Sequence, residues 1–534
     1  KTVGLFQIES AGMREALIQM KPNHIEDIIA LVALYRPGPM SNIPTYNDCK
    51  HGKQTPDYLH PLLEDILKPT YGVIIYQEQV MQIAQRLSGF TAGQADILRR
   101  AMGKKKRAEL EKQKQSFIAG AVKNGISKDV AAGIFLKIEP FAEYGFNKSH
   151  AAAYAIISYR TAFLKTYYPK EFIAASMTMD ISNQNKLSEF YEELKRLNIE
   201  IIRPDINECF ADFKTKGGKF YYALGGIKAV GYEAISNIVD ERLKNGNFKS
   251  ISDFLTRVNP KDINKLQLEG LVKAGAFDQI NLNRQSLFNS IPNLITKSKN
   301  IFENKSANQI DLFGENINQE NEIISNIEDW IFEERLSKEF EAIGFFISDH
   351  PLNQYKEIFN DYLIIDFQSF NNNDDLKNSN IAATLLKIQE RKTAKGTGYA
   401  VLKLTDLSSV FELFIFSDTL ELNREILKEG TSLILTLVKS ISNEENRFKR
   451  INVQKIASLK DLLSKPIQEV TFNLKSLREL DEISKFIPKS GDTIIKIKLS
   501  DEEHDYKFQL ENKRNIDRKT LNLLRNREIS AIIT

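Results

Sequence analysis

The hydrophobic period of this 534-residue chain changes once, near residue 379, so a single uniform core is excluded. Before that point apolar residues recur at helical spacing, as in 25–34 and 80–87. After it come apolar and β-branched runs of strand length, at 381–388, 400–404, 411–416, 432–438 and 450–453. We therefore predict a multidomain protein that is mainly α-helical at first, then forms an OB-type β-barrel, and ends in a small α+β domain.

Glycines and changes in composition divide these parts further. Short helical stretches after residue 186 are separated by glycines, which is typical of helix-hairpin-helix architecture. Between about 300 and 325, Asn, Gln, Glu and Lys replace apolar residues, which indicates an exposed linker. The predicted segments are a helical region 1–185, a tandem helix-hairpin-helix region 186–300, a linker 301–325, a helical connector 326–375, the barrel 376–460 and the α+β domain 466–534.

Overall charge and cysteine content restrict the function only loosely. The formal net charge is +3, so any contact with nucleic acid must come from local basic clusters. Cys49 and Cys209 form no CxxC pair, which argues against a zinc site or a disulfide framework. No apolar run is long enough to span a bilayer, and we expect a cytoplasmic protein without membrane contact. Because the sequence starts at Lys1 without an initiator Met, we also expect it to be a piece of a longer protein.

The densest basic cluster is 98–107, which contains Arg99, Arg100 and Lys104. Arg100 and Lys104 are four residues apart and share a helix face if the helix continues through Gly103. Guanidinium groups present a planar fork of donors to phosphate oxygens, and lysine adds point charge. The cluster therefore predicts a polyphosphate site, and a solvated helical face is the alternative.

A second candidate anion site is Tyr144-Gly-Phe-Asn-Lys-Ser-His150, which precedes an Ala-rich helical run. Asn147 or Ser149 can cap that helix and would place Lys148 and His150 beside free N–H groups at its positive end. The alternative is a simple turn in which His150 packs against a neighbour.

Two further segments have the composition of DNA contacts. In 224–235, a turn at Lys228, Val230 and Gly231 predicts backbone contact with a phosphate, although Ala229 replaces the first glycine of the usual Gly-x-Gly turn. Two packed helices joined by a turn are the alternative. In the barrel, a basic turn with one aromatic residue would suit single-stranded template, whereas a merely soluble hairpin tip with a core tyrosine is the other interpretation. The residues of that turn are Arg391, Lys392, Lys395 and Tyr399.

Several of these motifs together resemble one protein family. The segments 4–10, 33–39, 71–81, 98–106 and 144–150 look like signatures of the fingers of C-family replicative polymerases, the alpha subunit of bacterial DNA polymerase III, in the family's order. The resemblance implies that 1–185 forms the polymerase fingers and that 266–277 is a partner hairpin. It also implies a surface that receives the phosphates of an incoming nucleotide, lined by Arg99, Arg100, Lys104, Lys148, Ser149 and His150, with Tyr144 and Asn147 shaping the pocket beside it.

The same resemblance implies where the catalytic metal site lies. Phosphoryl transfer of this kind uses two Mg²⁺ ions held by clustered carboxylates. The family places those carboxylates in the palm, upstream of Lys1, together with an N-terminal PHP domain, and no two aspartates in this chain are two residues apart. We therefore expect no catalytic or metal-binding residue here, Mg²⁺ only in the full-length enzyme, and no polymerase activity from these residues alone.

The linker motif 309–313 looks like the pentapeptide with which bacterial polymerases bind the sliding clamp, the beta subunit. Two adjacent apolar side chains in an otherwise polar stretch would insert into an apolar pocket, oriented by a glutamine. The motif consists of Gln309, Ile310, Asp311, Leu312 and Phe313. The implied partners are primer-template DNA, dNTP, the clamp, the tau subunit of the clamp loader through 466–534, and a proofreading exonuclease subunit through the absent N-terminal part.

Two alternative functions stay open at this point. A non-enzymatic, clamp-tethered DNA-binding protein would also contain hairpins, a barrel and a clamp peptide. It would not need paired phosphate sites near residues 100 and 148, so dNTP binding separates the two. An error-prone C-family polymerase is the other alternative, and the clamp peptide with the tau-type tail favours the replicative form.

Overall fold

We describe a computed structural model of the chain. It covers residues 2–103, 107–306, 324, 326–393, 396–441, 449–488, 490–500, 505–527 and 529–533. These residues form two compact units, Lys1–Ile202 with Asp212–Ala223, and Arg203–Ala211 with Leu224–Thr534. Each unit is described by itself.

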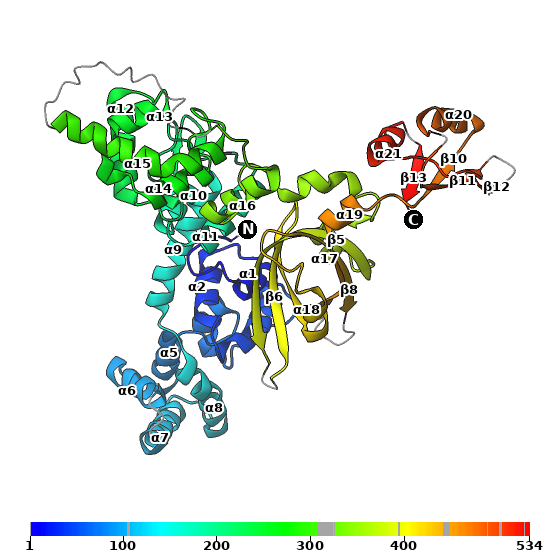
Figure 1. Ribbon diagram of the computed structural model, residues 1–534. Helices are drawn as coiled ribbons and strands as arrows, with labels where there is room; N and C mark the ends of the chain where they lie inside the picture. The colour runs from blue at the N-terminus through cyan, green and yellow to red at the C-terminus, as the bar shows by residue number, and fades with distance from the viewer. Residues whose placement is uncertain are drawn as a thin grey trace. The chain divides into compact units, whose positions relative to one another are not determined.

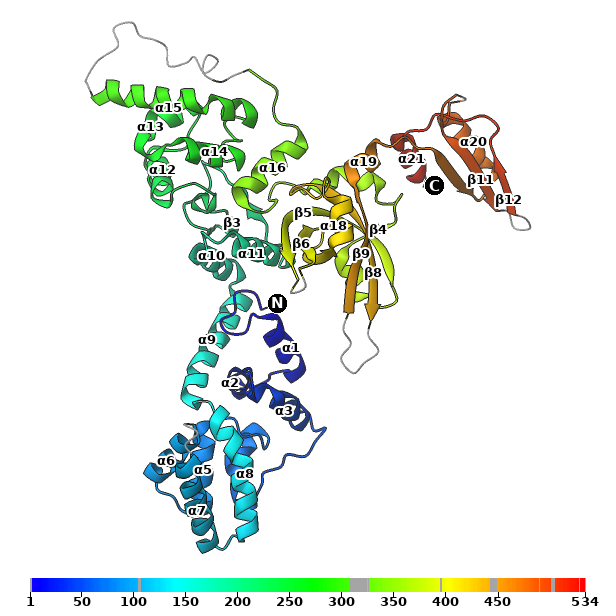
Figure 2. The same cartoon turned by 60° about the horizontal axis from the view of Figure 1, so that its bottom comes forward.

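The first unit is helical, apart from a three-stranded sheet in the order β1-β3-β2 (Ile201–Ile202, Lys219–Tyr221 and Lys214–Lys216). Its longer helices are α1 (Ala11–Met20), α2 (Ile25–Leu34), α3 (Ile43–Lys50), α5 (Gln77–Ser88), α6 (Ala92–Gly103), α7 (Arg107–Lys123), α8 (Lys128–Tyr144), α9 (Lys148–Tyr167), α10 (Pro169–Met179) and α11 (Gln184–Arg196). One apolar core lies among α5–α8, and a second lies among α1–α3 and the start of α9. In Figure 2, α9 runs from the α5–α8 group toward α10.

Helix α5 shows how the sequence fixes this unit. Val80, Ile83, Ala84 and Leu87 are all fully buried, at the i, i+3, i+4, i+7 spacing of an amphipathic helix. At its start, the side chain of Gln79 accepts hydrogen bonds from the N–H groups of residues 75 and 76. These contacts fix the direction in which the first turn of α5 presents its polar residues.

The helical part of the second unit follows the turn helix η4 (Leu224–Gly226). It contains α12 (Tyr232–Asn245), α13 (Ile251–Arg257), α14 (Lys265–Lys273), α15 (Arg284–Ser306) and α16 (Phe332–Ile343). Figure 1 shows α12 to α15 together as one green cluster. Within this cluster α14 packs on α15, and it also packs on α16.

The sheet that follows is antiparallel along the order β7-β6-β5-β8-β9. Its strands are β5 (Asn378–Lys392), β6 (Gly398–Thr405), β7 (Val410–Phe416), β8 (Ser432–Ile441) and β9 (Lys449–Ser458), with α18 (Ser417–Asn423) between β7 and β8. The first half of β5 pairs with β8 and the second half pairs with β6, and register shifts bend the ladders. The order and the inserted helix fit the OB-type barrel, which stays a prediction.

The last segment folds around β10 (Glu469–Leu474), α20 (Leu477–Phe486), β11 (Ile494–Ser500), β12 (Asp505–Gln509), α21 (Arg518–Arg525) and β13 (Ser530–Ile533). The strand order is β12-β11-β10-β13, and within it β10 and β11 are parallel while the other neighbours are antiparallel. The predicted fold class, helical at first and then rich in β-structure with an α+β end, is confirmed.

Candidate functional site

The two basic segments singled out in the sequence both contact the first turn of α5. From α6, Arg99 Nη1 donates a hydrogen bond to Gln77 Oε1 at 3.3 Å. From the start of α9, the Lys148 N–H lies 3.1 and 3.0 Å from the two carboxylate oxygens of Glu78. Asn147 Nδ2 also donates to Glu78, at 3.0 Å. Because Gln77 and Glu78 are consecutive, both segments contact the same helix start.

The arginine pair of α6 shares a single carboxylate. Arg99 donates to Asp96 Oδ1 from Nε at 2.9 Å and from Nη2 at 2.7 Å. Arg100 binds the other oxygen, Oδ2, from Nε at 2.7 Å and also from Nη2. These contacts hold the pKa of the Asp96 carboxyl below its ordinary value. The Arg99 side chain is 29% exposed and that of Arg100 is 62% exposed, so the pair lies at the surface.

At the start of α9, Asn147 is the helix cap. Its Oδ1 accepts the His150 N–H at 2.8 Å. The His150 ring packs on the rings of Tyr154 and Phe146, with centroid distances of 4.4 and 5.3 Å. The sequence predicted free N–H groups here, but those of Lys148 and His150 are already bound to side chains of the chain itself.

A cavity of about 670 Å³ opens beside this helix start. Lys148, Glu78, Tyr76 and Arg86 are among its lining residues, and the Lys148 ammonium lies 5.4 Å from the centre of the Tyr76 ring. Burial, with the nearby carboxylates of Glu26 and Glu78, raises the pKa of Tyr76. Neither arginine of the α6 pair lines this cavity. The cavity and the arginine pair therefore lie at different places along α5.

Some predicted site residues lie outside the described residues. These are Lys104, Lys395 and the motif residues Gln309, Ile310, Asp311, Leu312 and Phe313. The backbone of Tyr144 ends α8, but its side chain is not described. Ser149 is described and is exposed in the first turn of α9.

The predicted hairpin at 224–235 forms a tight turn before α12. Ala229 has a φ of +63°, the left-handed conformation that glycine adopts readily. Lys228 is exposed, and Gly231 is the N-cap of α12. Gly270 of α14 lies so close that a Cβ there would be 2.8 Å from the Lys228 carbonyl oxygen. The predicted partner segment therefore packs directly on the turn.

Within this turn the side chain of Val230 belongs to the core. The side chain of Val230 is buried at 8% exposure, and its N–H donates to the Ile227 carbonyl at 3.2 Å. An apolar side chain in a turn between two packed helices is drawn into the core, since burial removes it from water. The Val230 side chain therefore supports the hairpin from inside, and a backbone contact between this turn and a DNA phosphate stays a prediction.

The sheet of order β7-β6-β5-β8-β9 carries an aromatic surface that the sequence did not predict. Phe414 and Phe416 of β7 are 51% and 49% exposed, and Tyr399 of β6 pairs across from Phe416. The rings of Tyr399 and Phe414 lie 6.4 Å apart. Strand β7 is apolar at nearly every position, so the alternation that marks an exposed face was absent from its sequence.

Basic residues border this aromatic surface. A cavity of about 330 Å³ is lined by Phe414, Phe416, Lys449 and Arg450, among others. Arg391 pairs across from Tyr399, and its Nη2 donates to Gln389 Oε1 at 2.8 Å. Lys392 ends β5 and is exposed.

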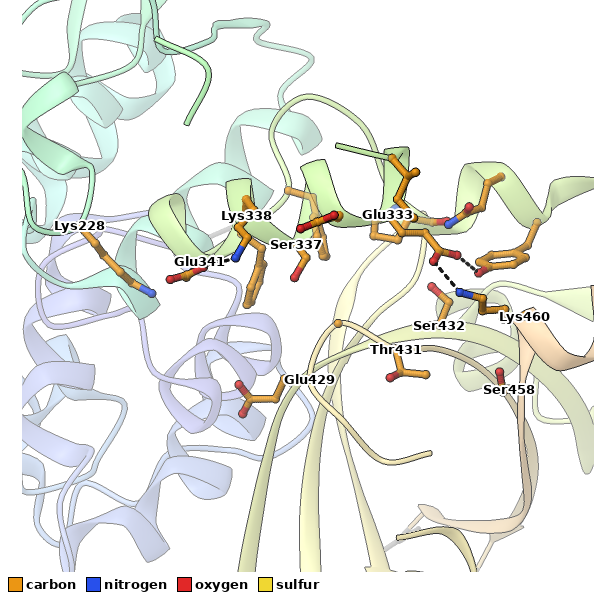
Figure 3. A pocket seen from close by; sticks show the side chains of 18 residues that line it. Lys228, Glu333, Ser337, Lys338, Glu341, Glu429, Thr431, Ser432, Ser458 and Lys460 are labelled. Carbon is orange, nitrogen blue, oxygen red and sulfur yellow. Dashed lines mark hydrogen bonds and ion pairs between the residues drawn. The ribbon is translucent and has the colours of Figure 1, made fainter. Parts of the chain in front are cut away.

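Another cavity, of about 670 Å³, lies in the second unit beside α16 and is shown in Figure 3. Its walls hold three lysines and four glutamates, including Lys228 of the hairpin. Lys460 donates to Glu333 at 3.2 Å, and Lys338 lies 3.8 Å from Glu341. Because the charges are mixed and partly paired, this cavity does not concentrate positive charge for phosphate.

Within the described ranges, no three His, Cys, Asp or Glu side chains are grouped so that they could hold a metal ion. The same ranges contain no helix with the length and apolarity required to cross a bilayer.

Comparison with known proteins agrees with the arrangement of these motifs. Residues 1–125 match the family model of the bacterial DNA polymerase III alpha subunit finger domain, and residues 198–287 match a helix-hairpin-helix motif. The DNA polymerase III subunit alpha of Rickettsia bellii is 44% identical over 463 residues, covering 81% of this chain and 39% of that protein.

Two other relatives have the same description. The DNA polymerase III subunit alpha of Caulobacter vibrioides is 40% identical over 450 residues, covering 84% of this chain and 39% of the relative. That of Borreliella burgdorferi is 38% identical over 530 residues, covering 96% of this chain and 45% of the relative. The chain thus spans less than half the length of these relatives.

Proposed function

The chain belongs to the family of bacterial DNA polymerase III alpha subunits, and from this premise we propose that it serves DNA-templated DNA synthesis by receiving the incoming dNTP and holding DNA. The observation that carries the proposal is that Arg99 contacts Gln77 and the start of α9 contacts Glu78, both in the first turn of α5. Cationic groups from two segments about fifty residues apart lie around one helix start. A triphosphate needs such a convergence of donors.

In this proposal the phosphates contact the guanidinium groups of Arg99 and Arg100 and the polar end of α9. Lys104, Lys148, Ser149 and His150 add charge or hydrogen bonds, and Tyr144 and Asn147 border the pocket, as the family resemblance implies. The ring of His150 is held by aromatic neighbours, so it presents a fixed edge. The position of the arginine pair at the surface supports this proposal.

DNA is held at two places in the second unit. At the hairpin, exposed Lys228 and the N-terminus of α12 at Gly231 present positive charge to a duplex phosphate. On the barrel, Tyr399, Phe414 and Phe416 offer ring faces on which single-stranded bases stack. Phosphates of that strand then contact Arg391, Lys392, Lys395, Lys449 and Arg450.

Two protein partners complete the proposal. The segment Gln309 to Phe313 binds the sliding clamp, and residues 466–534 contact the tau subunit of the clamp loader. Both assignments rest on the sequence resemblance. Residues 466–534 also have a packed core of their own around β10 and β11, so they can present a separate surface to a partner. In the full-length enzyme Mg²⁺ would be held by palm carboxylates that are not in this chain, as the family resemblance implies.

The test of the nucleotide site is equilibrium binding of a fluorescent dNTP to the 534-residue chain. We expect saturable binding that weakens at least about tenfold in the double variant Arg99→Ala/Arg100→Ala. The matched control is Arg424→Ala, which removes an exposed arginine paired with Glu390 and Glu421 and should leave affinity unchanged. Equal loss in both variants, or no saturable binding, would contradict the proposal.

A further inference from the structure

The two groups assigned to phosphate binding already carry carboxylates of the chain itself. Asp96 accepts hydrogen bonds from Arg99 and Arg100. Glu78 accepts hydrogen bonds from the Lys148 N–H and from Asn147 Nδ2. Both carboxylates occupy positions where the proposed nucleotide site needs an anion. In the protein without nucleotide, each of these groups is therefore already bound to a carboxylate.

The geometry at Asp96 leaves little of Arg99 available. Its Nε and Nη2 both point at one oxygen of Asp96, and its Nη1 is bound to Gln77. The Nε–Nη2 edge is the one that presents two parallel N–H groups to a phosphate or carboxylate. For Arg100 the same edge is also on Asp96. A phosphate that binds these edges must take the place of the carboxylate.

The charge of the cluster and its exposure both lower the free-energy cost of replacing the carboxylate with a phosphate. One carboxylate faces two guanidinium groups, so the cluster keeps a net positive charge that attracts a more highly charged anion. Asp96 is 25% exposed and Arg100 is 62% exposed, and ion pairs at such positions are weak. Hydrogen bonds from Arg100 and Arg99 hold the pKa of the Asp96 carboxyl below its ordinary value, so both arginines favour its anionic form.

Glu78 repeats the arrangement at α9. Both of its oxygens accept the Lys148 N–H, and one also accepts Asn147 Nδ2. Residue 78 comes from α5, 70 positions away from residue 148, so the contact is tertiary and not part of the helix's own cap. It also lines the cavity of about 670 Å³ beside α9, so a ligand can reach it.

We propose that Asp96 and Glu78 are internal stand-ins for phosphate, which the triphosphate of the nucleotide displaces when it binds. This inference rests on the proposed nucleotide site. The two carboxylates hold the donors in place in the empty protein, and each must swing away or lose its partner as phosphate oxygens arrive. Because the two carboxylates compete with the triphosphate, they reduce the affinity of the site for nucleotide. They also keep anions that bind more weakly than a triphosphate out of the site.

The opposite role would make them positioning residues that stay bound and orient the donors. Affinity separates the two roles, because neutralising a competitor tightens binding while removing a support weakens it. The isosteric variants Asp96→Asn and Glu78→Gln keep the size of the side chain and remove its charge. Displacement predicts that each variant binds dATP and inorganic tripolyphosphate about two- to fivefold more tightly than the unmodified chain.

The experiment is isothermal titration of the full 534-residue chain with dATP and, separately, with tripolyphosphate. The control variant Glu421→Gln removes the carboxylate with which α18 pairs to its capping residue Arg424, an exposed i,i+3 pair, and should change neither affinity. Thermal unfolding of each variant confirms that it is folded. Tighter binding of tripolyphosphate shows that phosphate, and not the base, displaces the carboxylate.

The outcomes separate this inference from the function on which it rests. Absence of dATP binding to the unmodified chain, or binding that survives Arg99→Ala/Arg100→Ala, overturns the nucleotide site itself. Binding that depends on the arginines but is unchanged or weaker in both carboxylate variants overturns displacement and leaves the site standing. If only one variant binds more tightly, displacement holds for that carboxylate and is overturned for the other.

Discussion

Ala229 adopts a backbone conformation that costs an L-residue with a Cβ about 1–2 kcal/mol, with φ at +63° in the turn before α12. Glycine adopts it without that cost, so we expect Ala229→Gly to stabilise the second unit by about 0.5–1 kcal/mol, after the entropy that glycine gains in the unfolded chain is subtracted. Urea unfolding of both proteins at pH 7 measures the difference.

The control for this substitution is the same change at an ordinary helical position. Ala234, in the first turns of α12, has no left-handed backbone, so Ala234→Gly should destabilise by up to about 1 kcal/mol. Opposite signs for the two variants are the expected result. A loss of stability in both would show that the turn does not store the strain assigned to Ala229.

Glu193 gives the first unit a defined sensitivity to acid. Burial alone would raise its pKa, but hydrogen bonds from Arg196 and Lys165 lower it to about 2, from an ordinary value of 4.5. A carboxyl group whose pKa is lowered by folding contributes stability above its unfolded pKa and loses it as pH falls toward the folded value. Burial lowers the pKa of Lys165, although its ion pair with Glu193 opposes that shift.

We therefore expect the unfolding free energy of the first unit to fall by about 2 kcal/mol between pH 6 and pH 3 through Glu193 alone. Glu193→Gln should lower stability at pH 6 and remove this part of the decline. Urea unfolding followed by helical circular dichroism at both pH values provides the measurement. The neighbouring Glu192→Gln, which removes a surface pair with Lys195, should change the pH dependence by less than about 0.5 kcal/mol.

At the scale of elements, the contact between α14 and the hairpin turn depends on a missing side chain. A Cβ at Gly270 would lie 2.8 Å from the Lys228 carbonyl oxygen and 3.1 Å from Val230 Cγ2. Gly270→Ala must push α14 away from the turn, at a cost of about 1–3 kcal/mol. We expect lower stability and weaker binding of the chain to duplex DNA, measured by unfolding and by fluorescence anisotropy at fixed salt.

Gly133 in α8 is the matched control, since a Cβ there would have no atom within 4 Å. Gly133→Ala should gain about 0.5–1 kcal/mol from helix propensity and leave DNA binding unchanged. If Gly270→Ala were as stable as the unmodified chain, the close approach of α14 to the turn would not constrain the hairpin.

The linker motif is tested as an element of its own. Leu312→Ala with Phe313→Ala removes the two apolar anchors and should weaken binding to the sliding clamp at least tenfold, or about 1.4 kcal/mol. Surface plasmon resonance on immobilised clamp measures this. Asn316→Ala with Asn318→Ala changes the same polar stretch without touching the anchors, and its affinity should equal that of the unmodified chain.

Elements were predictable where their physical cause is local. The switch from helices to strands follows from apolar spacing, and the cap of α9 follows from Asn147, because both depend on residues a few positions apart. The pairing of Asp96 with Arg99 and Arg100 has a local cause too, since an i, i+3 and i+4 spacing places the three side chains on one helix face. The sequence therefore contains enough information to predict that pairing, although the prediction of a polyphosphate site at 98–107 did not include Asp96.

Contacts between distant residues were not predictable in this way. Nothing near residue 78 indicates that its carboxylate lies on the Lys148 N–H, since that contact depends on how α5 packs against α9. The exposed rings of β7 were hidden for a related reason. A strand sequence that is apolar on both faces is typical of a buried strand. The rings of Phe414 and Phe416 are exposed to solvent because β7 is the last strand of its sheet, which the sequence does not indicate.

At the scale of the second unit, the C-terminal α+β domain is tied to the connector by one buried carboxylate. Asp361 is 2% exposed and lies 2.6 Å from Arg518 Nη1 and 2.5 Å from Arg525 Nη1, both on α21. Arg518 also donates to the Leu462 carbonyl at 3.0 Å. Removing one partner of a buried pair leaves uncompensated charge, which costs about 3–5 kcal/mol.

We therefore expect Asp361→Ala to release the C-terminal domain from the connector while its own core stays folded, because Val470, Phe472 and Ile495 are fully buried inside it. Limited proteolysis should cut the segment around 459–468 at least tenfold faster in the variant. Glu482→Ala, which removes an exposed pair with Arg527 at 4.0 Å, serves as the control and should be cut at the unmodified rate. Equal cutting rates for all three proteins would mean that apolar contacts, and not the two arginines, hold the domain in place.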